Sequence, residues 1–176
     1  MNISLLPGNG SSCKATRYEY ELIIVNFLNN NKNNLGDNCL EISGNTGIFK
    51  KFFNNYTITN YPEVDAHNLP YEDDTYDCVI FNQVLEHVKK PWICVNEAYR
   101  VLKKGGIIIL VSPFIYQFHS YPNDYWRFTE EGLSILVEKF QKILLKGRSG
   151  NVKLLEHMLK YPNDRRSPDM KKLQLL

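Results

Sequence analysis

The stretch DAHNLPYEDDTYDCVIFNQVLEHVKKPWICVNEAYRVLKKGGIIILVSP, residues 65–113, decides the fold class of this chain. Residues 78–81 are continuously apolar, which is typical of a strand covered on both faces. Residues 91–102 begin with proline and place apolar side chains three or four positions apart, so they predict a helix that ends just before Gly105. GGIIILVSP then predicts a second, fully buried strand.

The sequence before this stretch repeats the alternation of helix and strand. Residues 17–30 predict an amphipathic helix, and NCLEIS, residues 38–43, predicts a short strand. Residues 48–53 predict one or two helical turns that pack on a sheet. YTIT and EVDA, which begin at Tyr56 and Glu63, are two further strand candidates. The expected class is therefore α/β, a mostly parallel, doubly wound sheet with helices on both faces.

The sequence after Pro113 begins with a long loop. Residues 113–129 are rich in aromatic and polar residues, and loops of this length inside compact domains are usually functional. A helix is expected over residues 130–140, with Thr129 as its N-cap. QKILLK predicts one more strand and NVKLLEHMLK a last helix, followed by an irregular tail.

Length and composition bound the organisation and the partners of the chain. The 176 residues suit one domain, with its core over about residues 18–147 and the last helix and tail over 151–176. A formal net charge of +2 gives no basic face that would predict nucleic-acid binding. No run of about 18 apolar residues and no leader pattern occurs, so we expect a soluble, cytoplasmic protein without a membrane partner.

The cysteines predict neither a thiolate metal site nor a disulfide framework. Cys13, Cys39, Cys78 and Cys94 are far apart in sequence, and none forms a CxxC pair. We expect buried, reduced thiols. No metal site is predicted elsewhere in the sequence.

The turn after the first strand, LEISGNTG at residues 40–47, is a candidate cradle for a ligand. Ligands of open parallel sheets bind outside the carboxyl ends of the strands, and the first strand-to-helix turn is the usual place. Gly44 and Gly47 permit a close backbone approach, and Glu41 offers a carboxylate. The spacing does not match GxGxxG, which disfavours a dinucleotide site. An ordinary turn with a solvated glutamate explains this pattern equally well.

Residues 65–113 closely resemble the core of class I S-adenosylmethionine-dependent methyltransferases. Those proteins have an acid followed by LPF, an acidic turn, FD-V entering a strand, then LEH opening a helix, and RVLKPGG before the next strand. With LEISG and the stretch H-x-x-P-x-DYWRFT, the likeness extends over about residues 39–133. The latter stretch is similar to a subgroup often met in glycan and cell-surface metabolism. The Rossmann-like fold and the cofactor S-adenosylmethionine, with S-adenosylhomocysteine as product, are what the resemblance implies.

The resemblance also implies which residues would hold this cofactor. Glu41 would lie near its methionine end, and the backbone of the turn Ser43, Gly44, Asn45 and Gly47 would wrap it. Ser43 and Asn45 replace glycines that are usual in the family.

The remaining implied cofactor residues follow later strands. Asn60 is the nearest counterpart of the acid that holds the ribose hydroxyls. Asp65 matches the acid that accepts from the adenine amino group, with the amide of Ala66 beside it. Asn82 and Gln83 leave the strand at 76–82, where relatives contact the methionine portion. The structural alternatives are that Asp65 is a turn residue and that Asn82 or Gln83 caps a helix.

Candidate catalytic residues crowd into the loop. His119 is the expected proton acceptor, Asp124 would orient it, and Arg127 would hold an anionic acceptor. The alternative is that Trp126 and Phe128 pack the loop down and that Asp124 pairs with Arg127 structurally. Glu86 and His87 are expected to serve packing at a helix start.

The sequence thus predicts an enzyme that transfers a methyl group to an oxygen or nitrogen of a small molecule, with a sugar or cell-surface glycan precursor as the expected acceptor class. The competing hypothesis is a non-catalytic scaffold or regulatory module whose cofactor affinity is weakened at Ser43, Asn45 and Asn60. A dinucleotide oxidoreductase is a distant third. Oligomeric state cannot be read from these residues.

Overall fold

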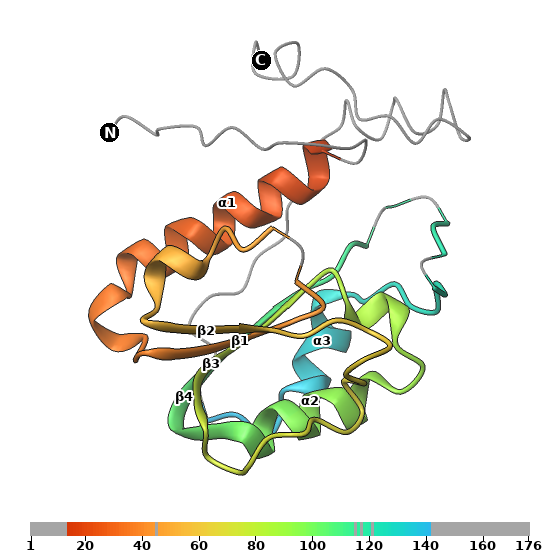
Figure 1. The fold of residues 1–176 in the computed structure, drawn as a ribbon. Helices are drawn as coiled ribbons and strands as arrows, with labels where there is room; N and C mark the ends of the chain where they lie inside the picture. Colours follow the sequence, from red (N-terminus) through yellow and green to blue (C-terminus); the bar gives the residue numbers. More distant parts are fainter. Residues whose placement is uncertain (1–13, 45, 115, 117, 121, 142–176) are drawn as a thin grey trace, which may run out of the picture.

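The computed structural model describes residues 14–44, 46–114, 116, 118–120 and 122–141. These residues form three layers: one helix, a four-stranded sheet, and two helices on the opposite face (Figure 1). The helix α1 (Lys14–Asn30) covers one face, and α2 (Pro91–Val101) and α3 (Glu130–Leu136) cover the other. The α/β class with helices on both faces is therefore confirmed.

All described strands run parallel. They are β1 (Asn38–Ile42), β2 (Asn55–Ile58), β3 (Tyr76–Asn82) and β4 (Leu102–Val111), in the spatial order β2-β1-β3-β4. Cys39 to Ile42 of β1 pair with Cys78 to Phe81 of β3, whose last residue, Asn82, pairs with Val111 of β4. The chain reverses its direction of travel across the sheet between β2 and β3, with β1 and β3 adjacent at that switch point.

Two local predictions, at EVDA and LEH, are wrong. EVDA is a turn, because Asp65 accepts a hydrogen bond from the backbone N–H of His67, two residues on, which curls the chain. By contrast, the helical turn expected over residues 48–53 is present, as the single 3₁₀ turn η2 (Lys50–Phe52), and its phenylalanines pack in the core. LEH forms a separate 3₁₀ turn, η3 (Leu85–His87), and does not open α2.

The strand predicted at GGIIILVSP differs from the expectation in two respects. β4 begins earlier, at Leu102, and its residues from Ile107 to Val111 are half-buried, not fully buried. β4 is an edge strand of the sheet formed by the described residues, so it has a neighbour on one side. The other strand predictions, at NCLEIS, YTIT and YDCVIFN, are confirmed.

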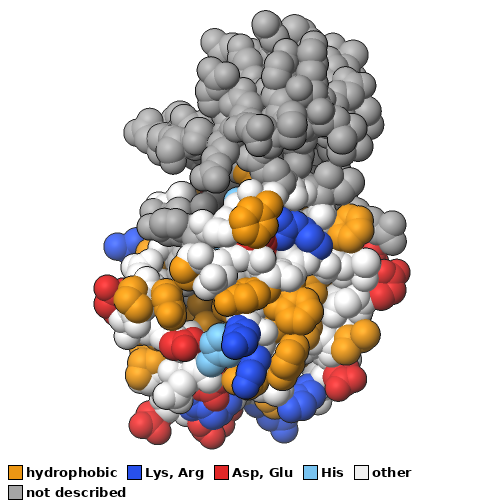
Figure 2. Space-filling model, turned by 90° about the vertical axis from the view of Figure 1, so that its right-hand side faces the viewer, with side chains coloured by type: hydrophobic (Ala, Val, Ile, Leu, Met, Phe, Trp, Pro, Cys, Tyr) orange, Lys and Arg blue, Asp and Glu red, His pale blue; other side chains and the backbone are white. Residues whose placement is uncertain are grey.

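The long loop after β4 has no regular structure in its described residues. It leads to α3, where Thr129 accepts from the N–H of Gly132 at 3.0 Å, so the predicted N-cap is confirmed. α3 ends at Leu136, earlier than expected, because the chain continues as turns. Hydrophobic side chains gather across the middle of the face that lies to the right in Figure 1, with charged groups around them (Figure 2).

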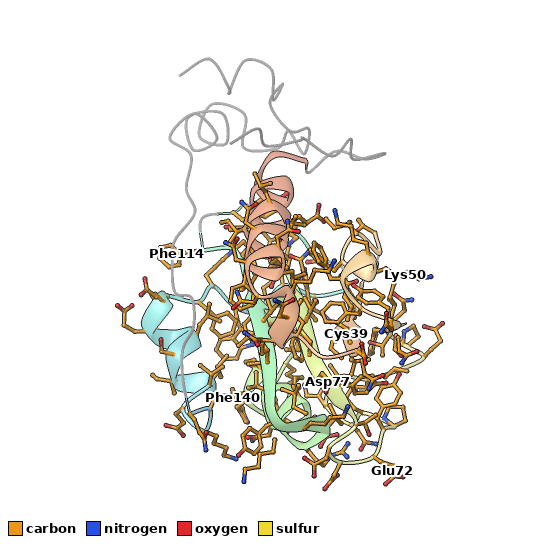
Figure 3. All side chains as sticks on the ribbon, turned by 90° about the vertical axis from the view of Figure 1, so that its left-hand side faces the viewer. Cys39, Lys50, Glu72, Asp77, Phe114 and Phe140 are labelled. Carbon is orange, nitrogen blue, oxygen red and sulfur yellow. The ribbon has the colours of Figure 1, made fainter. Side chains whose placement is uncertain are left out.

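The core has two parts, one on each face of the sheet. Leu40, Ile42, Val79 and Phe81 point toward α2, and alternate residues of the same strands point toward α1. Cys39 belongs to the α1 side, and Figure 3 shows it beside that helix. Such two-sided burial explains why β1 and β3 read as apolar runs and not as alternating patterns.

The amino edge of the sheet is closed by one carboxylate. Asp77, labelled in Figure 3, accepts from the backbone N–H groups of Asp37 and Asn38 at 3.1 and 2.9 Å and from Lys103 Nζ at 2.9 Å. Burial alone would raise the pKa of Asp77, but these hydrogen bonds, led by that of Lys103, lower it. At the amino edge Asp77 therefore ties the start of β1 to β3 and β4.

Several predictions concern residues outside the described part. The strand at QKILLK beyond its first residue, the helix at NVKLLEHMLK, the tail and Cys13 all belong there. Among the described residues, Cys39, Cys78 and Cys94 are buried free thiols, as expected. No helix in the described ranges is both long and apolar enough to cross a membrane.

Gly36 provides a test of the amino edge. It has φ +70°, and a Cβ added there would lie 2.4 Å from Cβ and Cγ of Asp77. We expect Gly36→Ala to lower the free energy of unfolding by about 2–4 kcal/mol, from left-handed strain plus overpacking. Gly105→Ala is the matched control, because Gly105 has φ +85° but no atom within 4 Å of the added Cβ. Urea unfolding of both variants measures the difference, and equal losses would contradict the proposed role of Asp77.

Candidate functional site

The carboxyl edge of the sheet gathers the polar residues that leave each strand. β1, β3 and β4 are parallel, so their ends meet at one edge, and the pairing of Ile42 with Phe81 and of Asn82 with Val111 fixes their relative positions. The backbone N–H of Gln83 donates to the carbonyl of Val111 at 2.8 Å, which extends this alignment beyond the ladder. The residues after β1, β3 and β4 therefore form one continuous rim.

Glu41 is a buried carboxylate at this rim. Its residue is 1% exposed, and Tyr56 of β2 donates its hydroxyl proton to Oε2. Burial raises the pKa of Tyr56, so the phenol remains a donor at neutral pH. Two neighbouring strands thus hold the orientation of this carboxylate.

Gly44 lies directly over the Glu41 carboxyl group. A Cβ added at Gly44 would be 2.3 Å from Cδ and 2.5 Å from Oε2 of Glu41. Only glycine permits the turn to approach the carboxylate this closely. Gly44 is thus required because the turn packs directly on Glu41. The spacing of the glycines in the sequence did not reveal this contact.

Two non-glycine residues at the rim have left-handed backbone conformations. Ser43 after β1 has φ 51° and Gln83 after β3 has φ 58°. Each such conformation costs of order 1 kcal/mol and persists only where surrounding structure imposes it. Both lie at the first position beyond a central strand, where the chain turns sharply at the rim.

Asn82 and Gln83 carry buried polar atoms without partners. Asn82 is 3% exposed, and neither its amide nitrogen nor its amide oxygen has a hydrogen-bond partner among the described residues. The same holds for Nε2 of Gln83. An unsatisfied buried group costs about 1–3 kcal/mol, so a structural cap does not account for this amide pair. A ligand that bonds to them would recover that cost.

Asn60 and Asp65 are exposed, in contrast to Asn82. With its amide nitrogen toward the backbone, Asn60 donates to the carbonyls of Thr59 and Gly44 at 3.2 Å each. Asp65 accepts from the N–H and from Nδ1 of His67, at 2.9 and 2.6 Å. Asn60 therefore ties β2 to the turn over Glu41, and Asp65 begins a turn while its carboxylate stays accessible.

The other predicted cofactor residues divide into three cases. Ala66 is buried in the core on the α2 side of the sheet. Gly47 has φ 60°, and an added Cβ there would meet only Ile58 Cδ1, at 3.9 Å. Asn45 lies outside the described residues.

The loop residues Asp124, Arg127 and His119 are brought together as expected. The Asp124 side chain is 1% exposed and forms a two-pronged pair with Arg127, with Oδ2 2.7 Å from Nη2. The hydrogen bond from Arg127 lowers the pKa of Asp124 to about 2. Oδ2 also accepts from the His119 N–H at 2.8 Å and lies 3.2 Å from His119 Nδ1. Asp124 thus contacts His119, which the catalytic hypothesis expected, and it also pairs with Arg127, which the structural alternative expected.

Glu86 is the site residue that the sequence interpretation missed. It is fully buried, its Oε2 accepts from Ser112 Oγ at 3.1 Å, and its Oε1 has no hydrogen-bond partner in the described part of the chain. Burial raises the pKa of Glu86 to about 7. A charged residue between Leu85 and the nearby Val88 was the available signal, but the expected helix start provided an ordinary explanation for it.

The comparisons with known proteins agree with this geometry. A family model described as a methyltransferase domain matches residues 37–110. Residues 37–110 are thus similar to a methyltransferase domain. The matched segment contains β1, β2, β3, all of β4 except Val111, and every described cofactor candidate.

Curated relatives match this domain over part of their length. The rice protein 2-methyl-6-phytyl-1,4-hydroquinone methyltransferase 1 is 43% identical over 54 residues, which are 31% of this chain and 16% of the relative. A ubiquinone/menaquinone biosynthesis C-methyltransferase, UbiE, from Sinorhizobium fredii is 26% identical over 111 residues, 60% of this chain and 39% of the relative. The aligned residues thus span well under half of these relatives.

Solved structures share the fold of the chain. A SAM-dependent methyltransferase from Archaeoglobus fulgidus superposes with a TM-score of 0.50 at 16% identity, over 85% of this chain and 90% of that one. The MccD protein superposes with a TM-score of 0.52 at 14% identity, over 88% and 86%. At this identity the likeness establishes the class I methyltransferase fold alone.

The family implies S-adenosylmethionine as cofactor, and the rim residues of the methyltransferase domain fit it. The cofactor carries an ammonium, a carboxylate, ribose hydroxyls and an adenine amino group. Glu41 offers a buried carboxylate, and Asn82 and Gln83 offer buried amide atoms that lack partners within the described ranges. Gly44 keeps a side chain away from the same place. Donors, acceptors and space therefore suit a polar, charged ligand.

Asn82 allows a test of whether its amide is kept for a ligand. We expect Asn82→Leu, which preserves the branched shape, to change the free energy of unfolding by less than about 1 kcal/mol, because no bond is lost. Thr59→Val is the control, since Thr59 is equally buried but accepts from the Ser43 N–H at 3.3 Å. It should cost about 1–3 kcal/mol. Denaturant unfolding measures both, and equal losses would indicate that Asn82 is a structural residue.

Proposed function

We propose that this chain transfers the methyl group of S-adenosylmethionine to a small-molecule acceptor. The supporting observation is that the segment matching the methyltransferase domain, residues 37–110, carries buried amide atoms at the carboxyl edge of its sheet that lack partners among the described residues. If these amide atoms served only packing, the free-energy cost of removing them from water would not be offset by a hydrogen bond. We also propose that the chain is a single domain.

Residues from three segments, which follow β1, β3 and β2, would hold the cofactor. Glu41 and the turn at Ser43 and Gly44 would hold the methionine end, and Asn45 and Gly47 continue the same turn. Asn82 and Gln83 would complete that end from β3.

The nucleoside end would be held by the segments after β2. Asn60 would face the ribose hydroxyls, since its exposed amide oxygen remains available when the nitrogen is used by Thr59 and Gly44. Asp65 and the amide of Ala66 would face the adenine edge. The exposed position of the Asp65 carboxylate suits that task.

The chain itself has a modest chemical task. When bound, S-adenosylmethionine supplies a methyl group on a sulfonium, which departs as a neutral thioether. Alignment of the acceptor with that methyl group provides much of the rate, so few catalytic side chains are needed. The rim residues would orient the cofactor, and the loop after β4 would position the acceptor.

A proton acceptor is needed only if the attacking group must lose a proton. His119 remains the predicted one, because Asp124 lies 3.2 Å from its Nδ1 and fixes the ring. Arg127 is engaged by Asp124, so we propose that it positions the loop and contributes its charge to the acceptor site only secondarily.

The acceptor class is proposed no more narrowly than a small molecule. The names of the rice and Sinorhizobium relatives refer to a hydroquinone and to quinone biosynthesis, and the latter to carbon methylation. The sugar or glycan acceptor expected from the loop sequence gains no support from them. Methylation at oxygen or nitrogen stays a prediction.

Calorimetric titration with S-adenosylmethionine and S-adenosylhomocysteine tests the proposal. We expect micromolar affinity for both, weakened at least tenfold by Gly44→Ala, because the added methyl group displaces the Glu41 carboxylate. Asp65→Ala should also weaken binding, through loss of the adenine contact. Gly132→Ala in α3 is the matched control, since its added Cβ meets no atom closer than 3.5 Å.

Each outcome of this titration has a defined meaning. Binding that is lost in Gly44→Ala and kept in Gly132→Ala supports the cofactor site. A folded chain that binds neither compound would refute the proposal and favour the non-catalytic scaffold.

A further inference from the structure

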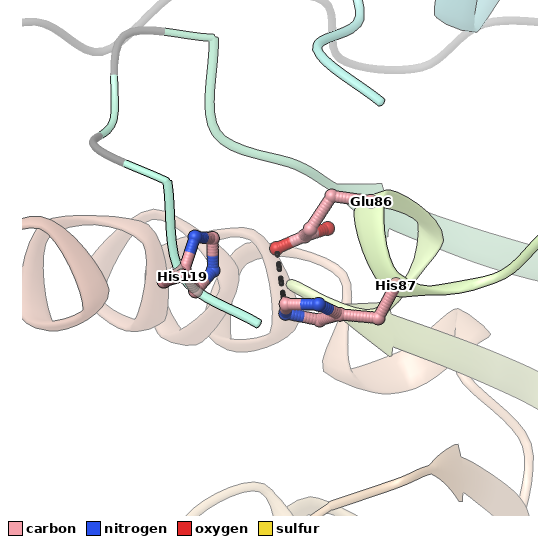
Figure 4. A group of neighbouring side chains, drawn as sticks. All are labelled: Glu86, His87 and His119. Atoms are coloured by element: carbon pink, nitrogen blue, oxygen red, sulfur yellow. Dashed lines mark ion pairs between the residues drawn. The ribbon is translucent and has the colours of Figure 1, made fainter. Parts of the chain in front are cut away.

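Glu86, His87 and His119 form a cluster that the methyl-transfer proposal does not require. One ligand-type atom from each residue lies within 4.8 Å of the other two (Figure 4). Glu86 is fully buried, and the side chains of His87 and His119 are 17% and 24% exposed. We propose that this cluster binds a divalent first-row transition cation of the zinc type.

The buried carboxylate carries the first part of the argument. Oε1 of Glu86 has no hydrogen-bond partner among the residues that the structure describes, and it lies 3.8 Å from Nε2 of His87. Oε2 is already engaged by Ser112 Oγ. One oxygen is thus held and the other is directed toward the imidazole, as in a carboxylate ligand whose second oxygen is hydrogen-bonded.

The two imidazole rings each have an oxygen atom near Nδ1. Nδ1 of His87 lies 2.6 Å from the carbonyl oxygen of Asn123, and Nδ1 of His119 lies 3.2 Å from Oδ2 of Asp124. Histidine ligands of metals usually donate one ring N–H to a carbonyl or carboxylate and bind the ion through the other nitrogen. In both rings Nδ1 lies near an oxygen atom, so Nε2 is the ligand atom in this arrangement.

The loop is attached to η3 at this point, which gives the cluster a defined shape. The N–H groups of Tyr125 and Trp126 donate to the carbonyl of Glu86 at 2.8 and 3.3 Å. Nε1 of Trp126 donates to the carbonyl of Val88 at 2.9 Å. These bonds hold the segment carrying His119 against the turn carrying Glu86 and His87.

The distances suit zinc after a small contraction. Ligand bonds of about 2.0–2.2 Å in tetrahedral geometry separate ligand atoms by about 3.3 Å. Small side-chain adjustments of His87 and His119 that keep the contacts at Nδ1 would close the remaining gap. Two imidazoles and one carboxylate favour zinc and its neighbours over magnesium, and three protein ligands leave a fourth position open.

The local charge also suits a cation. The Glu86 carboxylate would bind the ion directly, and the Asp124 carboxylate lies next to Nδ1 of His119. The nearby Arg127 is paired with Asp124 through both of its terminal nitrogens. A cation bound there would occupy Nε2 of His119, so the ligand role excludes the role of proton acceptor for the same histidine.

The test is calorimetric titration of the untagged full chain with Zn²⁺ after treatment with a chelator, in a Cys13→Ser background because thiolates also bind zinc. We expect one site per chain, with the affinity lowered at least tenfold in each of Glu86→Gln, His87→Gln and His119→Gln. Asp124→Asn should lower it about tenfold, because the charge beside His119 Nδ1 is lost. Co²⁺ should give visible absorption bands typical of four-coordination, and Mg²⁺ should not compete.

The matched control is His67→Gln. His67 also has a carboxylate at Nδ1, from Asp65, but its Nε2 accepts from the Lys90 N–H at 3.2 Å. This variant should bind Zn²⁺ as the parent does. Circular dichroism and thermal unfolding establish that each variant is folded.

Two results would overturn the inference. One is a folded chain without Zn²⁺ affinity, and the other is unchanged affinity in both His87→Gln and His119→Gln. None of the three cation ligands is a predicted cofactor residue. Titration with S-adenosylhomocysteine, with and without chelator, therefore tests the proposed function separately from the cation site.

Discussion

The parallel pairing of β1 with β3 and of β3 with β4 is the constraint on which the rest of the structure depends. Because the strands run in one direction, their carboxyl ends meet, and the register that pairs Asn82 with Val111 places the residues after each strand side by side. Burial on both faces then puts Glu41 and Asn82 in surroundings almost free of water. At the opposite edge Asp77 is engaged by the Asp37 and Asn38 N–H groups and by Lys103.

The carboxyl edge also concentrates the energetic cost of the fold. Ser43 and Gln83 have left-handed backbone conformations, and the amide of Asn82 is buried without a partner in the described part of the chain. Each feature costs of order 1 kcal/mol or more. Costs of this kind accumulate where a site is preorganised for a ligand. The same edge continues through Ser112 to Glu86, where η3 meets the loop that carries His119.

Sequence patterns predict the elements well where local physics dominates. The apolar runs of β1 and β3, Pro91 at the start of α2 and the cap at Thr129 each have a local cause, and each prediction is confirmed. The strand predicted at EVDA does not form, because the Asx turn of Asp65 outweighs a weak strand pattern. The cluster at Glu86 could not be predicted, since it depends on where the loop returns, and that path is fixed by backbone bonds from Tyr125 and Trp126.

The central claim is that the carboxyl edge of the sheet holds S-adenosylmethionine. Hydrogen exchange with and without S-adenosylhomocysteine tests it most directly, because each backbone amide reports its own protection. The account predicts slower exchange at residues 41–47 and 82–87 and unchanged exchange at the amino edge, around Asp37 and Asn38. Binding that protects the amino edge, or leaves both rim segments unchanged, would contradict it.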